Sequence, residues 1–331
     1  MTETRFREHM ASGMGRSYSL WLLALIIAAI LLTYLFHSNI FVLSLIQELA
    51  VMILFATAYN LMLGFSGLLS FGHGGLFGIG AYTLALLMVK VKLSALWALM
   101  AAPLLTSIAA WGMGWLCLRL TGVYFAFLTL AFSQLIWAVI WKWRSLTGGD
   151  DGIIGIELSG AIGSSAGLFL LILIVVIVCA VLIKMLLIDS QFGFALRLIR
   201  ENPRRARAIG INVRGYQLLV FCASGFFTGI AGALYALHSG GAFVEYASVA
   251  KSFEPIWCSL VGGIYTFVGP IVGAALMLGL DHFISRFTES WALFAGAVLI
   301  IVVLFAPEGI VRLAECFYRR LFRRVGVEKW A

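Results

Sequence analysis

Long apolar runs dominate this sequence and restrict its fold more than any other feature. A helix needs about 20 mostly apolar residues to cross the hydrocarbon core of a membrane. Runs that approach this length occupy residues 18–36, 43–63, 73–89, 95–118, 122–141, 167–188, 216–238, 253–266, 269–283 and 290–306. Glycines and a proline punctuate the eighth and ninth of them. We therefore expect an all-α, polytopic integral membrane protein with 8–10 transmembrane helices, some of them broken by glycine.

The composition excludes most other classes of protein. Hydrophobic residues make up 62% of the 331 and charged residues 11%, whereas a soluble domain is roughly 45–50% apolar and about 25% charged. A cytoplasmic enzyme, a secreted disulfide scaffold and a disordered regulator are thereby excluded. The five cysteines form no CxxC pair and have no zinc-like spacing. We therefore expect no metal or redox site.

The distribution of basic residues predicts an orientation. With residues 1–17 in the cytoplasm and residues 18–36 as an uncleaved first span, most of the 23 Lys and Arg fall on the cytoplasmic side, as the positive-inside rule requires. Those placed on the outer side are Lys90, Lys92, Lys142, Arg144, Lys251 and Arg286. The expected layout is a cytoplasmic segment 1–17, a transmembrane domain 18–306 with a cytoplasmic loop 189–215, and a basic cytoplasmic tail 307–331.

A glycine-rich stretch, residues 60–82, predicts an interrupted helix. It contains Gly64, Gly67, Gly72, Gly74, Gly75, Gly78 and Gly80, and each glycine disfavours a helix by up to about 1 kcal/mol. Non-helical backbone at membrane depth is tolerated where protein or a water-filled cavity satisfies it, so a broken helix lining a pathway is one interpretation. Close helix packing is the other. We favour the break for Gly64 to Gly74 and leave both open for the last three glycines.

Several polar residues within the spans are candidates for a translocation path. Glu48 shares one helix face with Ser44 and Tyr59, and Thr129 and Ser133 make an i, i+4 pair. Plain interhelical hydrogen bonding is the alternative for all of them, and a lone histidine such as His73 is more often structural than a proton relay. Asp281 is expected to mark the outer end of its span. The path hypothesis comprises Glu48, Tyr59, Asn60, Gly72, His73, Gly74, Thr129 and Ser133.

The loop 189–215 contains signals for a short helix. Asn202 is a suitable N-cap, Pro203 a suitable first helical residue and Gly210 a suitable stop, which together predict a helix over residues 203–209. An ordinary basic loop is the alternative. A short helix capped at both ends is suited to docking a partner.

Several of these segments, in this order, resemble the M-type permease subunits of branched-chain amino acid ABC importers. The similar segments are residues 64–82, residues 147–152 (Thr-Gly-Gly-Asp-Asp-Gly), residues 200–213, residues 231–235 (Ala-Gly-Ala-Leu-Tyr), the pair Gly262 and Gly263, and the pair Gly269 and Pro270. The resemblance spans residues 43–309. It implies that an ATPase-coupling segment is formed by Arg200, Glu201, Asn202, Pro203, Arg204, Arg205, Ala206, Ala208 and Gly210.

The same resemblance implies partners and a location. These are a second, related permease subunit, two cytoplasmic ABC ATPase subunits and a periplasmic solute-binding protein, in the cytoplasmic (inner) membrane of a bacterium with both termini inside. No nucleic-acid partner is expected. The chain has no GxxxxGK[ST] sequence, so we expect it to bind no cofactor and the partner subunits to use the ATP.

The expected function is that of a transport subunit, not an enzyme: one half of the path of an ATP-driven importer for branched-chain amino acids. A permease for urea or short-chain amides is one alternative. Another is a secondary transporter coupled to protons or sodium through Glu48, His73 or Asp281. An intramembrane enzyme would need paired acid and base groups or metal ligands, and the chain has no HExxH sequence.

Overall fold

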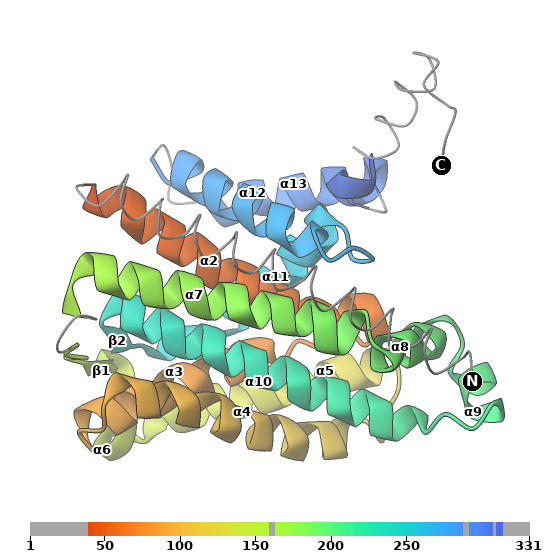
Figure 1. The fold of residues 1–331 in the computed structure, drawn as a ribbon, viewed down its shortest axis with the longest axis horizontal. Helices are drawn as coiled ribbons and strands as arrows, with labels where there is room; N and C mark the ends of the chain where they lie inside the picture. The colour runs from red at the N-terminus through yellow and green to blue at the C-terminus, as the bar shows by residue number, and fades with distance from the viewer. Residues whose placement is uncertain (1–38, 159–162, 287–290, 307–308, 314–331) are drawn as a thin grey trace, which may run out of the picture.

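The computed structural model describes residues 39–158, 163–286, 291–306 and 309–313. The expected first span, residues 18–36, the segment 1–17 and most of the tail 307–331 lie outside the described residues. Within them, apolar sequence forms helices that run side by side along the long axis of the molecule (Figure 1). The expectation of an all-α membrane protein is confirmed.

Helices account for nearly all of the described structure. The α-helices are α2 (Ile40–Asn60), α3 (His73–Val89), α4 (Ala95–Cys117), α5 (Val123–Lys142), α6 (Arg144–Thr147), α7 (Ser165–Leu182), α8 (Gln191–Glu201), α9 (Pro203–Ala208), α10 (Val213–Ser239), α11 (Val249–Gly262), α12 (Gly269–Ile284) and α13 (Trp291–Phe305). Two π-helical turns, η1 (Leu61–Ser66) and η4 (Ile183–Ile188), extend α2 and α7. Short 3₁₀ turns occur at η2 (Gly149–Asp151) and η5 (Val244–Ala247).

Among the described residues, five helices are long and apolar enough to cross a membrane. They are Ile40–Ser66, Ala95–Cys117, Val123–Lys142, Ser165–Met185 and Val213–Ser239. Shorter apolar helices are His73–Val89, Gly269–Ile284 and Leu293–Phe305. The eighth expected run, residues 253–266, is α11, which begins four residues earlier and ends at Gly262, because Gly263 adopts a φ of 126°.

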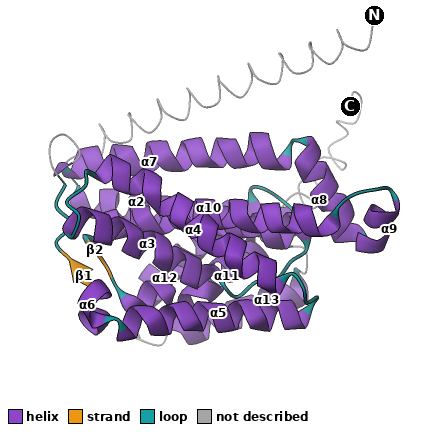
Figure 2. Cartoon of the chain, turned by 90° about the horizontal axis from the view of Figure 1, so that it is seen from below, coloured by secondary structure: helices purple, strands orange, loops and turns teal. Residues whose placement is uncertain are grey.

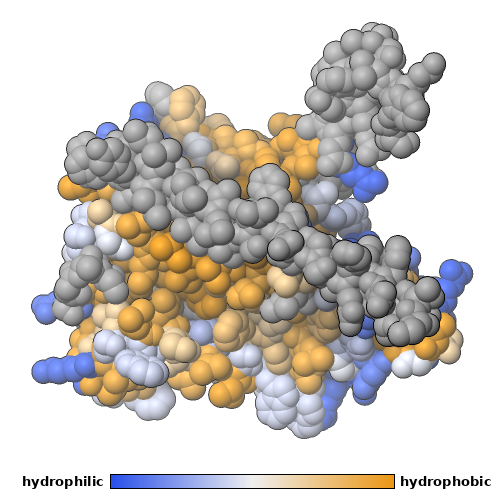
Figure 3. All heavy atoms as spheres, in the orientation of Figure 1, coloured by the Kyte–Doolittle hydropathy of each residue, from blue (hydrophilic) through white to orange (hydrophobic). Residues whose placement is uncertain are grey.

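The two ends of the bundle differ in structure. One end holds α6 and a small antiparallel pairing of β1 (Ile153–Ile154) with β2 (Gly241–Ala242), in which Ile153 faces Ala242; we call it the hairpin end. The other end holds α8 and α9 and is called the α9 end (Figure 2). On the face seen in Figure 3, hydrophobic residues cover the middle of the bundle and hydrophilic ones gather toward both ends.

Helix α10 occupies the centre of the bundle and packs against α2, α3 and α4. Gly225, Gly229 and Gly232 lie at i, i+4 and i+7 on this helix, where a Cβ atom would meet Ala110, Thr106 and the Phe77 backbone. Small residues at such positions allow helix backbones to approach closely in membranes. Gly80 and Gly229 meet backbone to backbone, so close packing is the role of Gly80.

The packing at Gly229 predicts a stability effect. A methyl group there would be forced against the Thr106 side chain and the Pro103 backbone, so Gly229→Ala should lower the free energy of unfolding by about 1–3 kcal/mol. Gly112 has open space at its Cβ position, and Gly112→Ala should be neutral or stabilising. Denaturant unfolding of the purified protein in detergent tests this, and equal effects of the two substitutions would contradict it.

Candidate functional site

The interruption between α2 and α3 lies inside the bundle. The π-helical turn η1 ends at Ser66, Gly67 adopts a φ of 73°, residues 67–72 are not helical, and α3 begins at His73. The predicted break is confirmed over residues 67–72 but is narrower than expected. Gly64 belongs to the π-helical turn and Gly74 to the first turn of α3.

Two hydroxyl groups of α5 bind the backbone of the interruption. Thr129 Oγ1 accepts a hydrogen bond from the Phe71 amide (3.1 Å) and Ser133 Oγ accepts one from the Gly75 amide (2.9 Å). Both side chains are fully buried. The first amide groups of a helix have no partner within the helix, and Ser133 supplies one for Gly75 of α3. Thr129 does the same for the amide of the non-helical Phe71.

A serine of α11 completes this arrangement from another side. Ser252 Oγ accepts a hydrogen bond from the Gly74 amide (2.9 Å) and lies 3.5 Å from Ser133 Oγ. A Cβ atom on Gly74 would collide with Ser252 and the Ser248 carbonyl group. The beginnings of α3 and α11 therefore meet within the bundle, and glycine at position 74 allows the contact.

His73 connects three helices. Its Nε2 lies 2.7 Å from Ser224 Oγ on α10, and the Ser224 hydroxyl donates to the Ala58 carbonyl on α2 (2.7 Å). Because that hydroxyl group has a single hydrogen, Nε2 of His73 is the donor in the first bond. The Tyr59 ring meets the imidazole edge to face at 4.8 Å, and His73 and Tyr59 are completely buried. His73 therefore links the beginning of α3 to α10 and α2.

The remaining path candidates on α2 fall into two groups. Glu48 lies 3.9 Å from His282 on α12, and its side chain is 26% exposed. Tyr59 is eleven residues further along α2, roughly 16 Å at 1.5 Å per residue, and contacts His73. Asn60 Nδ2 donates to the Thr266 carbonyl (3.2 Å). The face of α2 that Glu48 and Tyr59 share therefore meets α12 at one end and α3 at the other, and its role in a translocation path stays a prediction.

The structure also gives the surroundings of Gly72 and Asp281. Gly72 lies against Met113 and Thr129, where a side chain would crowd both. Asp281 lies in the last turn of α12, where it accepts a hydrogen bond from the Ser285 hydroxyl (2.9 Å). Asp281 is therefore near the end of its helix, as expected.

The predicted short helix is α9. The Asn202 side chain accepts hydrogen bonds from the Arg204 and Arg205 amides (3.0 and 3.1 Å), and Pro203 is in the first turn. The helix ends at Ala208, one residue earlier than predicted, because Ile209 already leaves the helical conformation and Gly210 has a φ of 89°.

Helix α9 is anchored by one buried residue. Ala206 is 2% exposed and packs with Ile199 of α8 and Val213 of α10. The residues around it that point away from the bundle are Glu201, Arg204, Arg205, Arg207 and Ala208, all exposed. This segment therefore presents a mostly basic surface at the α9 end on a rigid support.

Arg200, in the last turn of α8, joins this surface to the interrupted helix. Its guanidinium group donates to the Gly64 carbonyl (2.5 Å) and lies 4.7 Å above the Tyr265 ring. Gly67 lies directly against its side chain. The carbonyl groups of a π-helical turn near a helix end need such donors, and no sequence signal connects two residues 136 positions apart.

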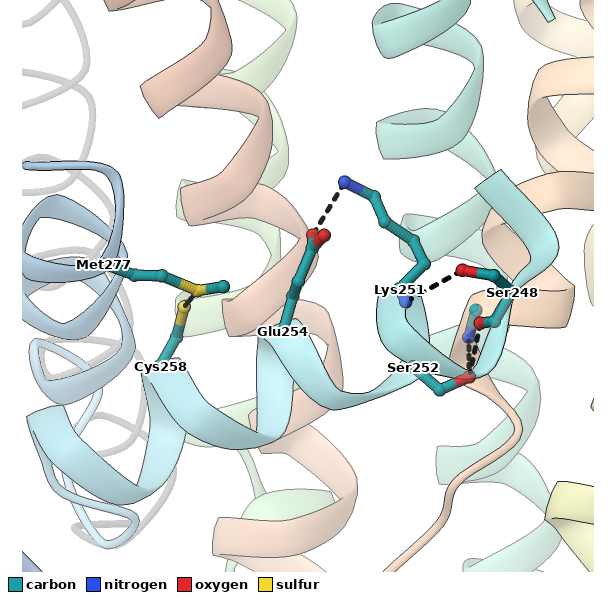
Figure 4. Close-up of polar contacts among 7 residues, drawn as sticks. Ser248, Lys251, Ser252, Glu254, Cys258 and Met277 are labelled. Atoms are coloured by element: carbon teal, nitrogen blue, oxygen red, sulfur yellow. Dashed lines mark hydrogen bonds and ion pairs between the residues drawn. The ribbon is translucent and has the colours of Figure 1, made fainter. Parts of the chain in front are cut away.

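Sequence reasoning missed an ion pair inside the bundle. Lys251 Nζ and Glu254 Oε2 lie 2.6 Å apart on α11 (Figure 4). Lys251 is 8% exposed and its ammonium group lies over the rings of Phe77 (5.1 Å) and Tyr235 (4.6 Å). The charge count treats Lys251 as an exposed residue on the outer side, but its side chain is buried among aromatic rings within the bundle. The sequence did carry a signal for this ion pair, because two opposite charges stand three residues apart at the edge of an apolar run.

The described residues contain no group of three or more His, Cys, Asp or Glu side chains placed to hold a metal ion. The arrangement at the site is therefore one of packing, hydrogen bonds and isolated ion pairs.

Comparisons with known proteins agree on one family. The model of the family described as branched-chain amino acid transport system / permease component matches residues 41–303. The high-affinity branched-chain amino acid transport system permease protein LivM of Escherichia coli (strain K12) is 28% identical over 286 residues, which cover 78% of this chain and 67% of LivM. LivH of Salmonella typhimurium is 26% identical over 288 residues, which cover 78% of this chain and 90% of LivH. No solved structure matches the chain.

The hydroxyl groups at the interruption predict a measurable loss of stability. Ser133→Ala or Ser252→Ala leaves a buried amide group without its partner, which should cost about 1–3 kcal/mol. Hydrogen exchange at Gly74 and Gly75 should accelerate in the same variants. Ser285→Ala removes an exposed hydroxyl group and serves as the control. Thermal unfolding in detergent and exchange mass spectrometry test this, and wild-type values for both buried serine variants would refute it.

Proposed function

The chain belongs to the branched-chain amino acid transport permease family, and on this premise we propose that it forms one half of the translocation path of an ATP-driven importer for branched-chain amino acids. The other half would be a related permease subunit. Two ATPase subunits would dock at the α9 end in the cytoplasm, and a periplasmic solute-binding protein would deliver substrate at the hairpin end. The membrane would be the cytoplasmic membrane of a bacterium.

The contact of Arg200 with Gly64 is the observation that carries this proposal. A rigid basic helix at the surface would dock an ATPase, and Arg200 ties the neighbouring helix α8 to the interrupted helix inside the bundle. Closure of the ATPases would move α8 and α9 as one body, and the interruption would move with them. Rigid-body rocking of spans about a fixed region is a common mode of alternating access.

The candidate path residues divide between two roles in this proposal. Glu48 is partly exposed and lies beside His282, so we assign it to the path surface. Tyr59, Asn60, Gly72, His73, Gly74, Thr129 and Ser133 hold the interrupted helix in position. No bond is made or broken by this chain. The subunit alone would not concentrate the substrate. The free energy that favours one access state over the other would come from the ATPases and would enter at the docking helix.

Reconstitution tests the proposed function. The purified complex with its ATPases, second permease and binding protein should take up radiolabelled leucine, isoleucine or valine into proteoliposomes only when ATP is hydrolysed. Labelled urea and acetamide serve as the comparison substrates. Uptake driven by a proton or sodium gradient without nucleotide would contradict the proposal, as would a preference for the amides.

The contact of Arg200 predicts an uncoupled variant. In Arg200→Ala the complex should assemble and hydrolyse ATP, while leucine uptake falls at least tenfold, because the docking segment no longer holds the interrupted helix. Arg200→Lys should retain part of the uptake, since a lysine supplies one donor without the planar guanidinium group. Arg197→Ala on the same helix is the matched control. Uptake and ATP hydrolysis are measured together, and coupled transport by Arg200→Ala would refute the assignment.

A further inference from the structure

The ion pair of Lys251 and Glu254 lies within α11, and the cation–π contacts of Lys251 with Phe77 and Tyr235 are what link it to α3 and α10. The two charges are three residues apart, so the bond between them joins no two helices. Burial of an ion pair carries a large desolvation cost, and neutral residues of similar volume are often equally stabilising. Charged residues inside a membrane protein are costly and more often functional than structural. The position of this pair in the bundle indicates a function that needs both charges.

The two partners differ in accessibility. The side chain of Glu254 is 20% exposed and that of Lys251 is 10% exposed. Phe253, between them in sequence, is 48% exposed and packs on Phe71 of the interruption. The Glu254 side chain is therefore the more accessible partner, although its Oε2 atom, which faces Lys251, is itself buried.

The surroundings of Lys251 allow the pair to open. The ammonium group lies over the faces of Phe77 and Tyr235, whose ring quadrupoles attract a cation. Tyr246 packs against Tyr235 at 4.9 Å and fixes that ring. If Glu254 turns to another cation, Lys251 keeps part of its stabilisation from the two rings. Its charge is then available to an incoming anion.

We propose that Lys251 and Glu254 are the subsite that passes the zwitterionic head of the amino acid, an inference that rests on the proposed function. Glu254 binds the α-ammonium group, Lys251 binds the α-carboxylate, and the pair closes again when the substrate leaves. When the substrate binds, the ion pair between Lys251 and Glu254 is replaced by two ion pairs with the substrate. When the substrate leaves, the original pair forms again, so the substrate is neither repelled nor trapped. A transit site requires such a balance between entry and release.

The subsite also selects by charge. An uncharged amide offers a partner to neither residue, and a simple amine or carboxylate satisfies one of them and leaves the other unpaired. Only a molecule that carries both a positive and a negative charge gives Lys251 and Glu254 each a new partner when it separates them. The aromatic residues beside the pair provide an apolar surface for a hydrophobic side chain.

The decisive variant removes both charges at once. Lys251→Met/Glu254→Gln leaves no uncompensated charge and should insert, assemble with its partners and melt at nearly the wild-type temperature. Its uptake of radiolabelled leucine in the reconstituted complex should fall at least tenfold. Lys251→Arg keeps the cation and should retain at least a third of the wild-type rate. Lys90→Met/Glu157→Gln makes the same chemical changes at the hairpin end and is the matched control.

The outcomes separate the subsite from the function on which it rests. Leucine uptake by Lys251→Met/Glu254→Gln within twofold of the wild-type rate overturns the subsite. Failure of this variant to assemble also overturns it, because the pair would then act through the fold. A wild-type complex that takes up no leucine with ATP refutes the proposed function itself, before any variant is compared.

Discussion

Backbone that leaves the helical conformation inside a membrane must find hydrogen-bond partners within the protein, and this requirement organises the structure. Helix α3 begins inside the bundle, and its first amide groups are bound by Ser133 and Ser252 from two other helices. At the other side of the interruption, Arg200 donates to the Gly64 carbonyl. The packing of α5, α8 and α11 around the break follows from these bonds.

The same bonds explain how an event at the surface could reach the centre of the bundle. Arg200 belongs to α8 and is two residues from the cap of α9, yet its side chain ends at the interrupted helix. Helix α9 is supported by the buried Ala206, so the basic surface of α9 and the interruption are joined through α8. This is the arrangement that the proposed coupling to separate ATPase subunits needs.

Much of the fold could be predicted from the sequence because its signals are local. Hydropathy located the helices, the cluster of glycines located the break, and Asn202 with Pro203 located α9 almost to the residue. Partners far apart in sequence carry no local signal. The bonds of His73 to Ser224 and of Arg200 to Gly64 join positions more than a hundred residues apart, so sequence reasoning could not find them.

Lys251 shows a second reason why prediction from the sequence fails. Counting charges on either side of the membrane treats a basic residue next to an apolar run as exposed, but α11 begins within the bundle and carries Lys251 among aromatic rings. The error arises from assuming that every apolar run forms a regular helix of full membrane length.

Coupling requires that α8 and the interruption move together, and distances between spin labels can measure this movement. Spin labels on α8 at Phe194, in the interruption at Leu69 and on α5 at Leu135, all exposed positions, would be measured in pairs in the assembled complex, without nucleotide and with ATP trapped. If the two segments move together, the distance from position 194 to position 69 stays unchanged when ATP is trapped, while both positions change their distance to position 135. Movement of position 194 relative to position 135 with position 69 left in place would contradict it.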